Sequence, residues 1–208
     1  MIQQANDTII AANETMKTIY DRRAVRKYKK TPVPRSIVEH VLEAGMMAPS
    51  AMNRQPWKFY VVMDPDTIHA FSREIAKVAF NDVVHTGIRE MVRTAAGLLH
   101  FSHSLNLHAL KDPVFYEAPV VIFVTGPNDN EWAPLDIGMC CENMMLAARS
   151  LGLDSCPVGF AKYVERTAVY SRLQVPYSES VHLAVILGYG DECPSDRERR
   201  TDNILFID

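Results

Sequence analysis

Three arginines near the N-terminus are the first residues whose type and spacing could do chemistry. Arg22, Arg23 and Arg26 place three guanidinium groups within five residues. A guanidinium group donates paired, coplanar hydrogen bonds, which match the oxygens of a phosphate group. The stretch therefore predicts a phosphate site, although its spacing alone fits the solvated end of a helix about equally well.

A second polar stretch, residues 49–57, lies between an apolar-periodic segment and a short β-branched run. Its two prolines restrict the backbone and remove two N–H donors. Ser50, Asn53 and Gln55 offer hydroxyl and amide groups that can hydrogen-bond the polar edge of a ring. Trp57 adds a large apolar wall. The stretch predicts a site for a ring-shaped ligand, and an ordinary helix-to-strand loop is the alternative.

The C-terminal tail contains a second basic cluster, Arg197, Arg199 and Arg200. Considered alone, this cluster fits a charged, solvated tail better than a binding site. Two separate arginine clusters that converge on one phosphate would, however, bind it through several charge-assisted hydrogen bonds. The tail is therefore a candidate second half of the phosphate site.

Other classes of site lack their motifs in this sequence. It contains no P-loop and no GxSxG, and Gly188-Tyr-Gly190 precedes acidic residues rather than completing a dinucleotide fingerprint. His100, His103 and His108 are close in sequence, but no carboxylate joins them at ligand spacing. Surface or packed histidines are therefore favoured over a metal site, and we expect no metal.

Composition favours one cytoplasmic domain. With 208 residues, 48% of them hydrophobic, residues 1–208 can bury a single core. A net charge of −3 offers no general attraction for nucleic acid or anionic membranes. We expect neither a signal peptide nor a membrane span, because no basic n-region or long apolar run occurs. The four cysteines lack CxxC spacing, which favours buried, reduced thiols, with Cys140 and Cys141 on different helix faces.

Apolar spacing predicts the elements that position these residues. Helices are expected at 13–21, 35–47, 67–80, 86–110 and 134–151, with a short one near 165–173, and strands at 58–63, 119–125 and 181–187. Asn13 is a suitable N-cap for the first helix, and Gly152 is placed to end the fifth. The pattern predicts a mixed fold with long helices around a small sheet. The 134–151 helix has no clear polar face, which a dimer interface would explain.

Four segments resemble the FMN-dependent nitroreductase family. They are RRAVRKY, APSAMNRQPWKFYVV, ENMMLAARSLGLDSCPVGF and AVILGYGDECPSDRERRTDNI, in the family's order along nearly the whole chain. The second is the most specific, because it matches the family's APSxxNxQPWxF block. The resemblance implies an α+β fold with a small mixed or antiparallel sheet, in an intertwined homodimer whose C-terminal tails embrace the partner.

The resemblance also implies an FMN site at the dimer interface. The matching positions are Arg22, Arg23, Ala24, Arg26, Pro49, Ser50, Ala51, Asn53, Pro157, Val158, Gly159, Arg197 and Arg199. The arginine segment and the tail would come from one subunit and the Pro49–Asn53 loop from the other. The chain departs from the family at Ala24, where a hydroxyl is common, and before Gly159, where many members carry a glutamate.

The implied activity is reduction of an electron-poor acceptor, such as a nitroaromatic or a quinone, by NAD(P)H with ping-pong kinetics. No side chain is assigned as an obligatory acid or base. Arg26 matches the family's basic residue near the pyrimidine end of the flavin, where a fixed cation stabilises negative charge. Two alternatives stay open: a member that acts on flavin or halogenated substrates, and a flavin-binding storage or regulatory protein without turnover.

Overall fold

A four-stranded antiparallel sheet forms the centre of the computed structural model, which describes residues 13–85, 112–196 and 198–207. The strand order is β1-β2-β4-β3, and every pairing between these strands is antiparallel. The strands are β1 (Lys58–Val62), β2 (Val120–Pro127), β3 (Asp154–Val158) and β4 (Glu179–Gly188). The predicted α+β fold with a small sheet is confirmed.

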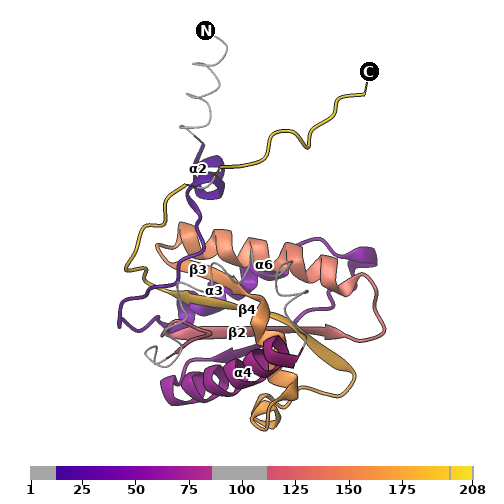
Figure 1. The fold of residues 1–208 in the computed structure, drawn as a ribbon. Coiled ribbons are helices and arrows are strands. Elements are labelled where there is room, and N and C mark those ends of the chain that lie inside the picture. Colours follow the sequence, from indigo (N-terminus) through magenta and orange to yellow (C-terminus); the bar gives the residue numbers. More distant parts are fainter. Residues whose placement is uncertain (1–12, 86–111, 197, 208) are drawn as a thin grey trace.

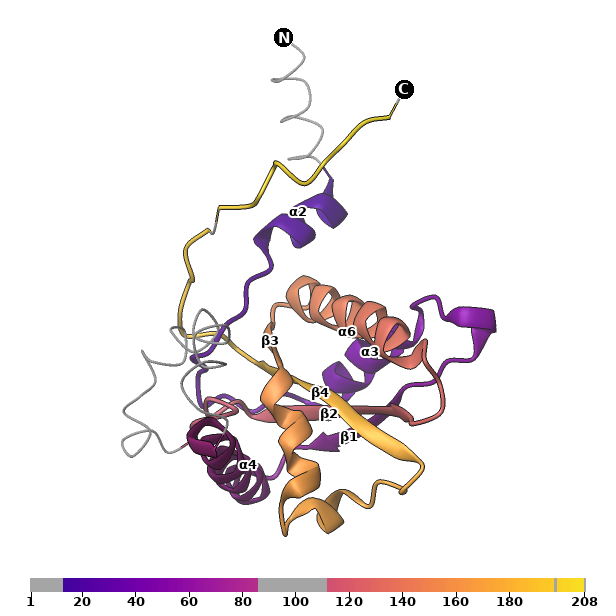
Figure 2. The same cartoon turned by 45° about the vertical axis from the view of Figure 1, so that its right-hand side comes forward.

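Helices cover both faces of this sheet (Figure 1). Helices α3 (Arg35–Met46) and α6 (Ala133–Ser150) lie on one face, and α4 (Pro65–His85) and the 3₁₀ helix η2 (Gly159–Arg166) lie on the other (Figure 2). Successive side chains of a strand point to opposite faces. In β2, accordingly, Ile122 packs with the α3 and α6 core, while Phe123 packs with the α4 and η2 core. None of the described helices is long and apolar enough to cross a membrane.

Several predicted boundaries agree with the structure. Helix α2 (Glu14–Asp21) begins after Asn13, whose side-chain oxygen accepts the Met16 backbone N–H at 3.0 Å. Helices α3 and α6 and strands β1, β2 and β4 lie where the apolar spacing predicts them. Helix α4 extends beyond its predicted end, and the expected 86–110 helix lies outside the described residues.

Two elements were predicted wrongly. No strand was predicted around Pro157, but this stretch forms strand β3, an edge strand of the sheet that pairs with β4. Proline is tolerated there because an edge strand leaves one row of N–H groups without a ladder partner. The single helix expected near 165–173 is instead two 3₁₀ helices, η2 and η3 (Tyr170–Leu173).

Helix α6 buries one broad stripe rather than its whole circumference. The stripe comprises Ala133, Asp136, Ile137, Cys140, Cys141, Met144, Met145 and Ala148. The adjacent Cys140 and Cys141 are both buried and belong to the same core cluster. Burial raises the pKa of both thiols to about 12, which keeps them protonated and unreactive at neutral pH. All four cysteines are free, and Cys193 is exposed rather than buried as expected.

Gly188, at the end of β4, allows the chain near the arginines to pack closely. A Cβ atom there would lie 2.7 Å from Pro119 Cδ and 2.7 Å from Tyr28 Cδ1, both in rigid rings. We expect Gly188→Ala to lower the free energy of unfolding by about 1–3 kcal/mol through overpacking. Chemical denaturation followed by circular dichroism measures this change.

Gly138→Ala is the matched control for that substitution. Gly138 lies inside α6, and a Cβ atom there meets nothing within 4 Å. Alanine is the better helix former, so this variant should gain roughly 0.5–1 kcal/mol in the same measurement. Equal effects of the two substitutions would contradict the close packing assigned to Gly188.

Candidate functional site

The segment that carries the arginines is joined to the sheet. The Val25 backbone N–H donates to Ser155 O at 3.0 Å, and Lys29 N–H donates to Tyr189 O at 2.8 Å. Tyr28 is buried between these two points, and its hydroxyl donates to Val25 O at 2.7 Å. The segment thus lies between β3 and the end of β4, which holds its backbone in place.

Two of the three guanidinium groups form ion pairs with carboxylates. Arg22 Nε donates to Glu142 Oε1 on α6 at 3.1 Å, and Arg23 pairs with Asp196 at the start of the tail. These carboxylates are half-exposed or fully exposed. Exposed ion pairs contribute little to stability, typically about 0–1 kcal/mol. A phosphate with two negative charges can therefore compete with these carboxylates for the arginines.

Arg26 directly follows Ala24 and Val25, the two residues that are bonded to Ser155 of β3. Its side chain is exposed, its backbone N–H donates to Glu192 Oε1 at 2.5 Å, and it hydrogen-bonds the side chain of Tyr116. Burial raises the pKa of Cys156, and the positive charges of Arg26 and Arg22 oppose that rise. The positive charges of Arg26 and Arg22 therefore act on the Cys156 position of β3.

The predicted Pro157–Gly159 stretch directly follows Cys156 in the chain. Ala24 bridges Ser155 in parallel, and Pro157 and Val158 follow on the same strand. Gly159 begins η2, and a Cβ atom there would meet nothing within 4 Å. The structure therefore brings the arginine segment and the Pro157–Gly159 stretch together within one chain.

The loop after Pro49 has an internal hydrogen-bond network. Ser50 Oγ accepts the Gln55 backbone N–H at 2.9 Å, and Asn53 Oδ1 accepts Gln55 Nε2 at 3.0 Å. Both bonds use an oxygen as acceptor, so the Ser50 hydroxyl proton and the Asn53 amide protons stay available as donors. The loop can offer these donors to acceptor atoms on the edge of a ring.

This loop adopts backbone conformations that most residues avoid. Met52, Asn53 and Gln55 have φ values of 52°, 55° and 46°. Left-handed conformations of residues other than glycine cost on the order of 1–3 kcal/mol each and persist only where surrounding contacts hold them. Such clusters occur preferentially at binding sites, and this one coincides with the loop that the sequence identifies as a candidate site.

Within one chain, the loop and the arginine segment contact α6 at different points. Ala51 contacts Asp136 in the first turn of α6, whereas Arg22 contacts Glu142, six residues further along that helix. At about 1.5 Å per residue, these two points are about 9 Å apart along the helix axis. Both ribbon views show the Ala51–Asn53 turn far from α2 (Figures 1 and 2). Within the described part of one chain, no hydrogen bond joins the loop to the arginine segment.

The tail leaves the body on the same side as α2 (Figure 2). Arg199 is exposed, Arg200 forms two hydrogen bonds with Asp202 at 3.0 and 3.1 Å, and Arg197 lies outside the described residues. Four consecutive apolar residues, Ile204 to Ile207, are 67–89% exposed. An apolar run of this kind on a chain surface marks a contact with another molecule.

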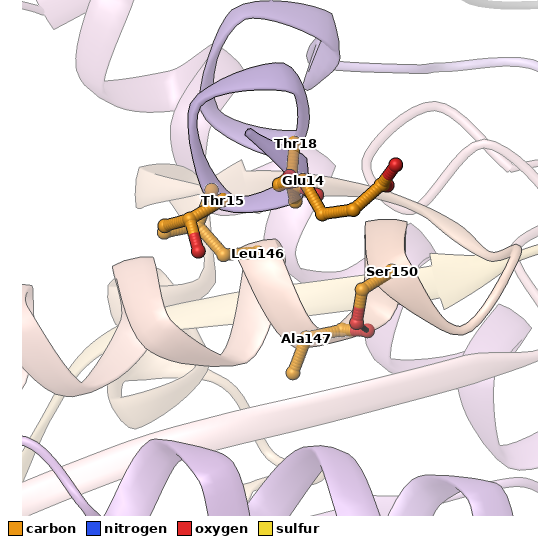
Figure 3. Close-up of a pocket in the computed structure, with 6 residues that line it drawn as sticks. All are labelled: Glu14, Thr15, Thr18, Leu146, Ala147 and Ser150. Carbon is orange, nitrogen blue, oxygen red and sulfur yellow. Dashed lines mark hydrogen bonds between the residues drawn. The ribbon is translucent and has the colours of Figure 1, made fainter. Parts of the chain in front are cut away.

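A hollow of about 260 Å³ separates α2 from α6 (Figure 3). Its lining residues are Glu14, Thr15, Thr18, Leu146, Ala147 and Ser150. Helix α2 has no buried residue, and its Ile19 and Tyr20 are about half exposed. The hollow shares none of the predicted site residues, and it shows how loosely α2 packs against its own chain.

Sequence reasoning missed several residues that contact the predicted site. Asp136 accepts the Ala51 N–H, Glu142 pairs with Arg22, Glu192 binds the Arg26 backbone and Tyr116 contacts the Arg26 side chain. Asp136 and Glu142 gave a weak sequence signal, since they are the two acidic residues of a mostly apolar helix. The other partners are fixed by contacts between distant segments.

The chain is similar to proteins of one family over most of its length. The model of the nitroreductase family matches residues 19–189. The 4-nitrobenzoate reductase of Pseudomonas putida is 29% identical over 195 residues, 84% of each chain. An NADH dehydrogenase of Thermus thermophilus is 51% identical over 55 residues, 26% of each chain. A Bacteroides fragilis nitroreductase with bound FMN shares the fold with a TM-score of 0.75 and 26% identity, over 95% of this chain and 100% of that one. Because the family model matches most of its length, the chain belongs to the nitroreductase family.

Proposed function

We propose that this protein is an FMN-dependent oxidoreductase that uses NAD(P)H to reduce nitroaromatic compounds, quinones or similar electron-poor acceptors. One observation carries the proposal: the arginine segment is bonded to β3 directly before the Pro157–Gly159 stretch. The names of the relatives support the reaction, since one reduces 4-nitrobenzoate and another is an NADH dehydrogenase.

The donors in the structure fit FMN. Arg22 and Arg23 supply cations for a terminal phosphate, and their present carboxylate partners are exposed enough to be displaced. Ser50 and Asn53 supply neutral donors for the oxygens and nitrogens of a ring edge. When bound, FMN supplies the redox chemistry, taking electrons from NAD(P)H and passing them to the acceptor.

The role of Arg26 is to stabilise negative charge on the ligand, not to donate or accept a proton. Its exposed guanidinium lies beside Tyr116 and near the Cys156 position of β3. A fixed cation at the pyrimidine end of the ring stabilises the negative charge that reduction places there, which favours two-electron transfer. A single site that serves both substrates in turn gives ping-pong kinetics.

Each site is assembled from two chains of a homodimer. The arginine segment, the Pro157–Gly159 stretch and the tail come from one chain, and the Pro49–Asn53 loop comes from its partner. Within one chain the two halves contact α6 at separate points, Asp136 and Glu142, and are not hydrogen-bonded to each other among the described residues, which supports this assignment. The exposed apolar residues of α2 and of Ile204 to Ile207 support a partner surface on the same side of the molecule.

Purified protein is expected to bind FMN rather than FAD, because the site offers two arginine clusters for a terminal phosphate and the sequence has no adenylate-binding glycine loop. Anaerobic NADH or NADPH should bleach the flavin absorbance, and an added nitroaromatic or quinone should restore it. Stopped-flow absorbance measures both steps. Extraction of FAD, or no uptake of micromolar FMN, would contradict the proposal.

The same experiment separates the enzyme from its alternatives. Bound FMN that neither nucleotide bleaches would identify a storage or regulatory protein. Bleaching that only free flavin or a halogenated compound reverses would identify a specialised member with that substrate.

A further inference from the structure

The Ala51 backbone N–H is already bonded within the protein. It lies 3.2 Å from both carboxylate oxygens of Asp136, a side chain that is 1% exposed. Ala51 therefore has no backbone donor left for a ligand, although it matches a cofactor-binding position of the family. Its contribution to the site is to connect the loop to α6.

Asp136 belongs to a core helix rather than to the loop itself. It lies in the first turn of α6, where the partial positive charge of the helix start stabilises an anion. A hydrogen bond from an amide to a carboxylate is stronger than one between neutral groups. The carboxylate thus provides a rigid, charged anchor on an element of the core, behind the loop rather than in contact with the site.

The loop requires such an anchor. Ala51 immediately precedes Met52 and Asn53, which both have left-handed backbones, and Met52 is 77% exposed. The Met52 side chain therefore contributes little packing to offset its conformation. The bonds made by Ser50 and Asn53 lie inside the loop, so the Ala51–Asp136 bond is the contact that ties this turn to the helix.

We infer that Asp136 is a positioning residue that holds the Ser50–Gln55 turn in its left-handed conformation, so that Ser50 and Asn53 present their donors to the ligand. This inference rests on the proposed function, because it takes FMN as that ligand. Asp136 touches neither substrate nor cofactor. Its effect is to organise the loop before the ligand binds, which reduces the entropy lost on binding.

Replacing Asp136 should weaken FMN binding without altering the fold. Asp136→Ala should raise the FMN dissociation constant about tenfold, which corresponds to loss of one hydrogen bond to a charged group. Asp136→Asn keeps one acceptor oxygen and should have a smaller effect. Flavin fluorescence titration measures the affinity, and hydrogen exchange of the Ala51 amide in cofactor-free protein should show loss of protection only in Asp136→Ala.

A second substitution separates positioning from a direct electrostatic effect. Met52→Gly removes the cost of the left-handed backbone at an exposed position. Combined with Asp136→Ala, it should restore part of the lost affinity, whereas a direct effect of the Asp136 charge on the flavin would not be restored. Ile137→Ala is the control for lost stability, because Ile137 is fully buried on the same helix turn but packs next to Gly126. It should lower Tm and leave the Ala51 amide protected.

The outcomes distinguish this inference from the proposed function. Wild-type protein that binds FMN, together with an Asp136→Ala variant of equal affinity and equal Ala51 protection, overturns the inference and leaves the function standing. Wild-type protein that does not bind FMN overturns the function, and Ala51 exchange in the variants then decides whether Asp136 orders the loop. Equal exchange in wild type and Asp136→Ala overturns the inference in that case too.

Discussion

A mixture of two inactive variants is expected to recover about a quarter of the wild-type activity, because random pairing makes about half of all dimers mixed and each mixed dimer has one intact site. One variant carries Arg22→Ala and Arg199→Ala. The other carries Ser50→Trp and Asn53→Asp. In the proposed dimer each site takes the arginines from one chain and the loop from its partner. In the mixed dimer, therefore, one site receives both sets of substitutions and the other receives none.

The loop substitutions are chosen to preserve the backbone. Ser50 has an extended conformation, with φ −142° and ψ 152°, which accepts tryptophan. Asn53 has a positive φ, which aspartate tolerates nearly as well as asparagine. Aspartate also keeps the oxygen that accepts Gln55 Nε2 while removing the outward donors. The two variants are unfolded and refolded together, with differential tags and native mass spectrometry to count mixed dimers.

Each variant refolded alone is the control and should stay inactive. If mixed dimers form in the expected proportion and no activity returns, each site is built within a single chain. In that case the Pro49–Asn53 loop would have to reach the arginine segment of its own chain. Among the described residues of one chain, the loop contacts α6 at Asp136 and the arginine segment contacts it at Glu142, with no hydrogen bond between the two segments, which argues against this arrangement.

Arg22→Ala is expected to weaken FMN binding roughly 10- to 150-fold, the equivalent of one charge-assisted hydrogen bond of about 1.5–3 kcal/mol. Arg199→Ala should lose affinity in the same range, because the proposed site brings the tail arginines to the same phosphate. Arg22→Lys should fall between wild type and alanine, since lysine keeps the charge but not the paired donors. Titration at several salt concentrations should show a shallower salt dependence for each alanine variant.

Arg35→Ala provides a matched control. Arg35 Nε donates to Glu39 Oε1 at 2.9 Å, much as Arg22 Nε donates to Glu142, but it lies exposed on α3 outside the predicted site. Its removal should leave FMN affinity unchanged. Unchanged affinity after separate alanine substitutions of Arg22, Arg199 and Arg200 would instead identify these side chains as solvated surface charges.

Local patterns in the sequence were enough to locate most elements. The apolar repeat of α3 and α6, the Asn13 cap and the apolar run of β2 each involve residues that are neighbours along the chain. Their conformations depend mainly on short-range hydrogen bonding and on which side chains avoid water. Strand β3 escaped prediction because Pro157 breaks the usual strand signal, and only its pairing with β4 makes that segment a strand.

For the candidate site too, some features follow from the sequence and others only from the tertiary structure. The sequence by itself identified the residue types that can bind a phosphate and a ring edge, from the arginines at 22–26 to Ser50 and Asn53, because those types follow from local chemistry. Only the tertiary structure decided that Asp136, 85 residues away in the chain, anchors Ala51. It also decided that the loop and the arginine segment contact α6 at different points, Asp136 and Glu142. Contacts of this kind depend on how whole helices and strands pack, and a pattern spanning a few neighbouring residues does not contain that information.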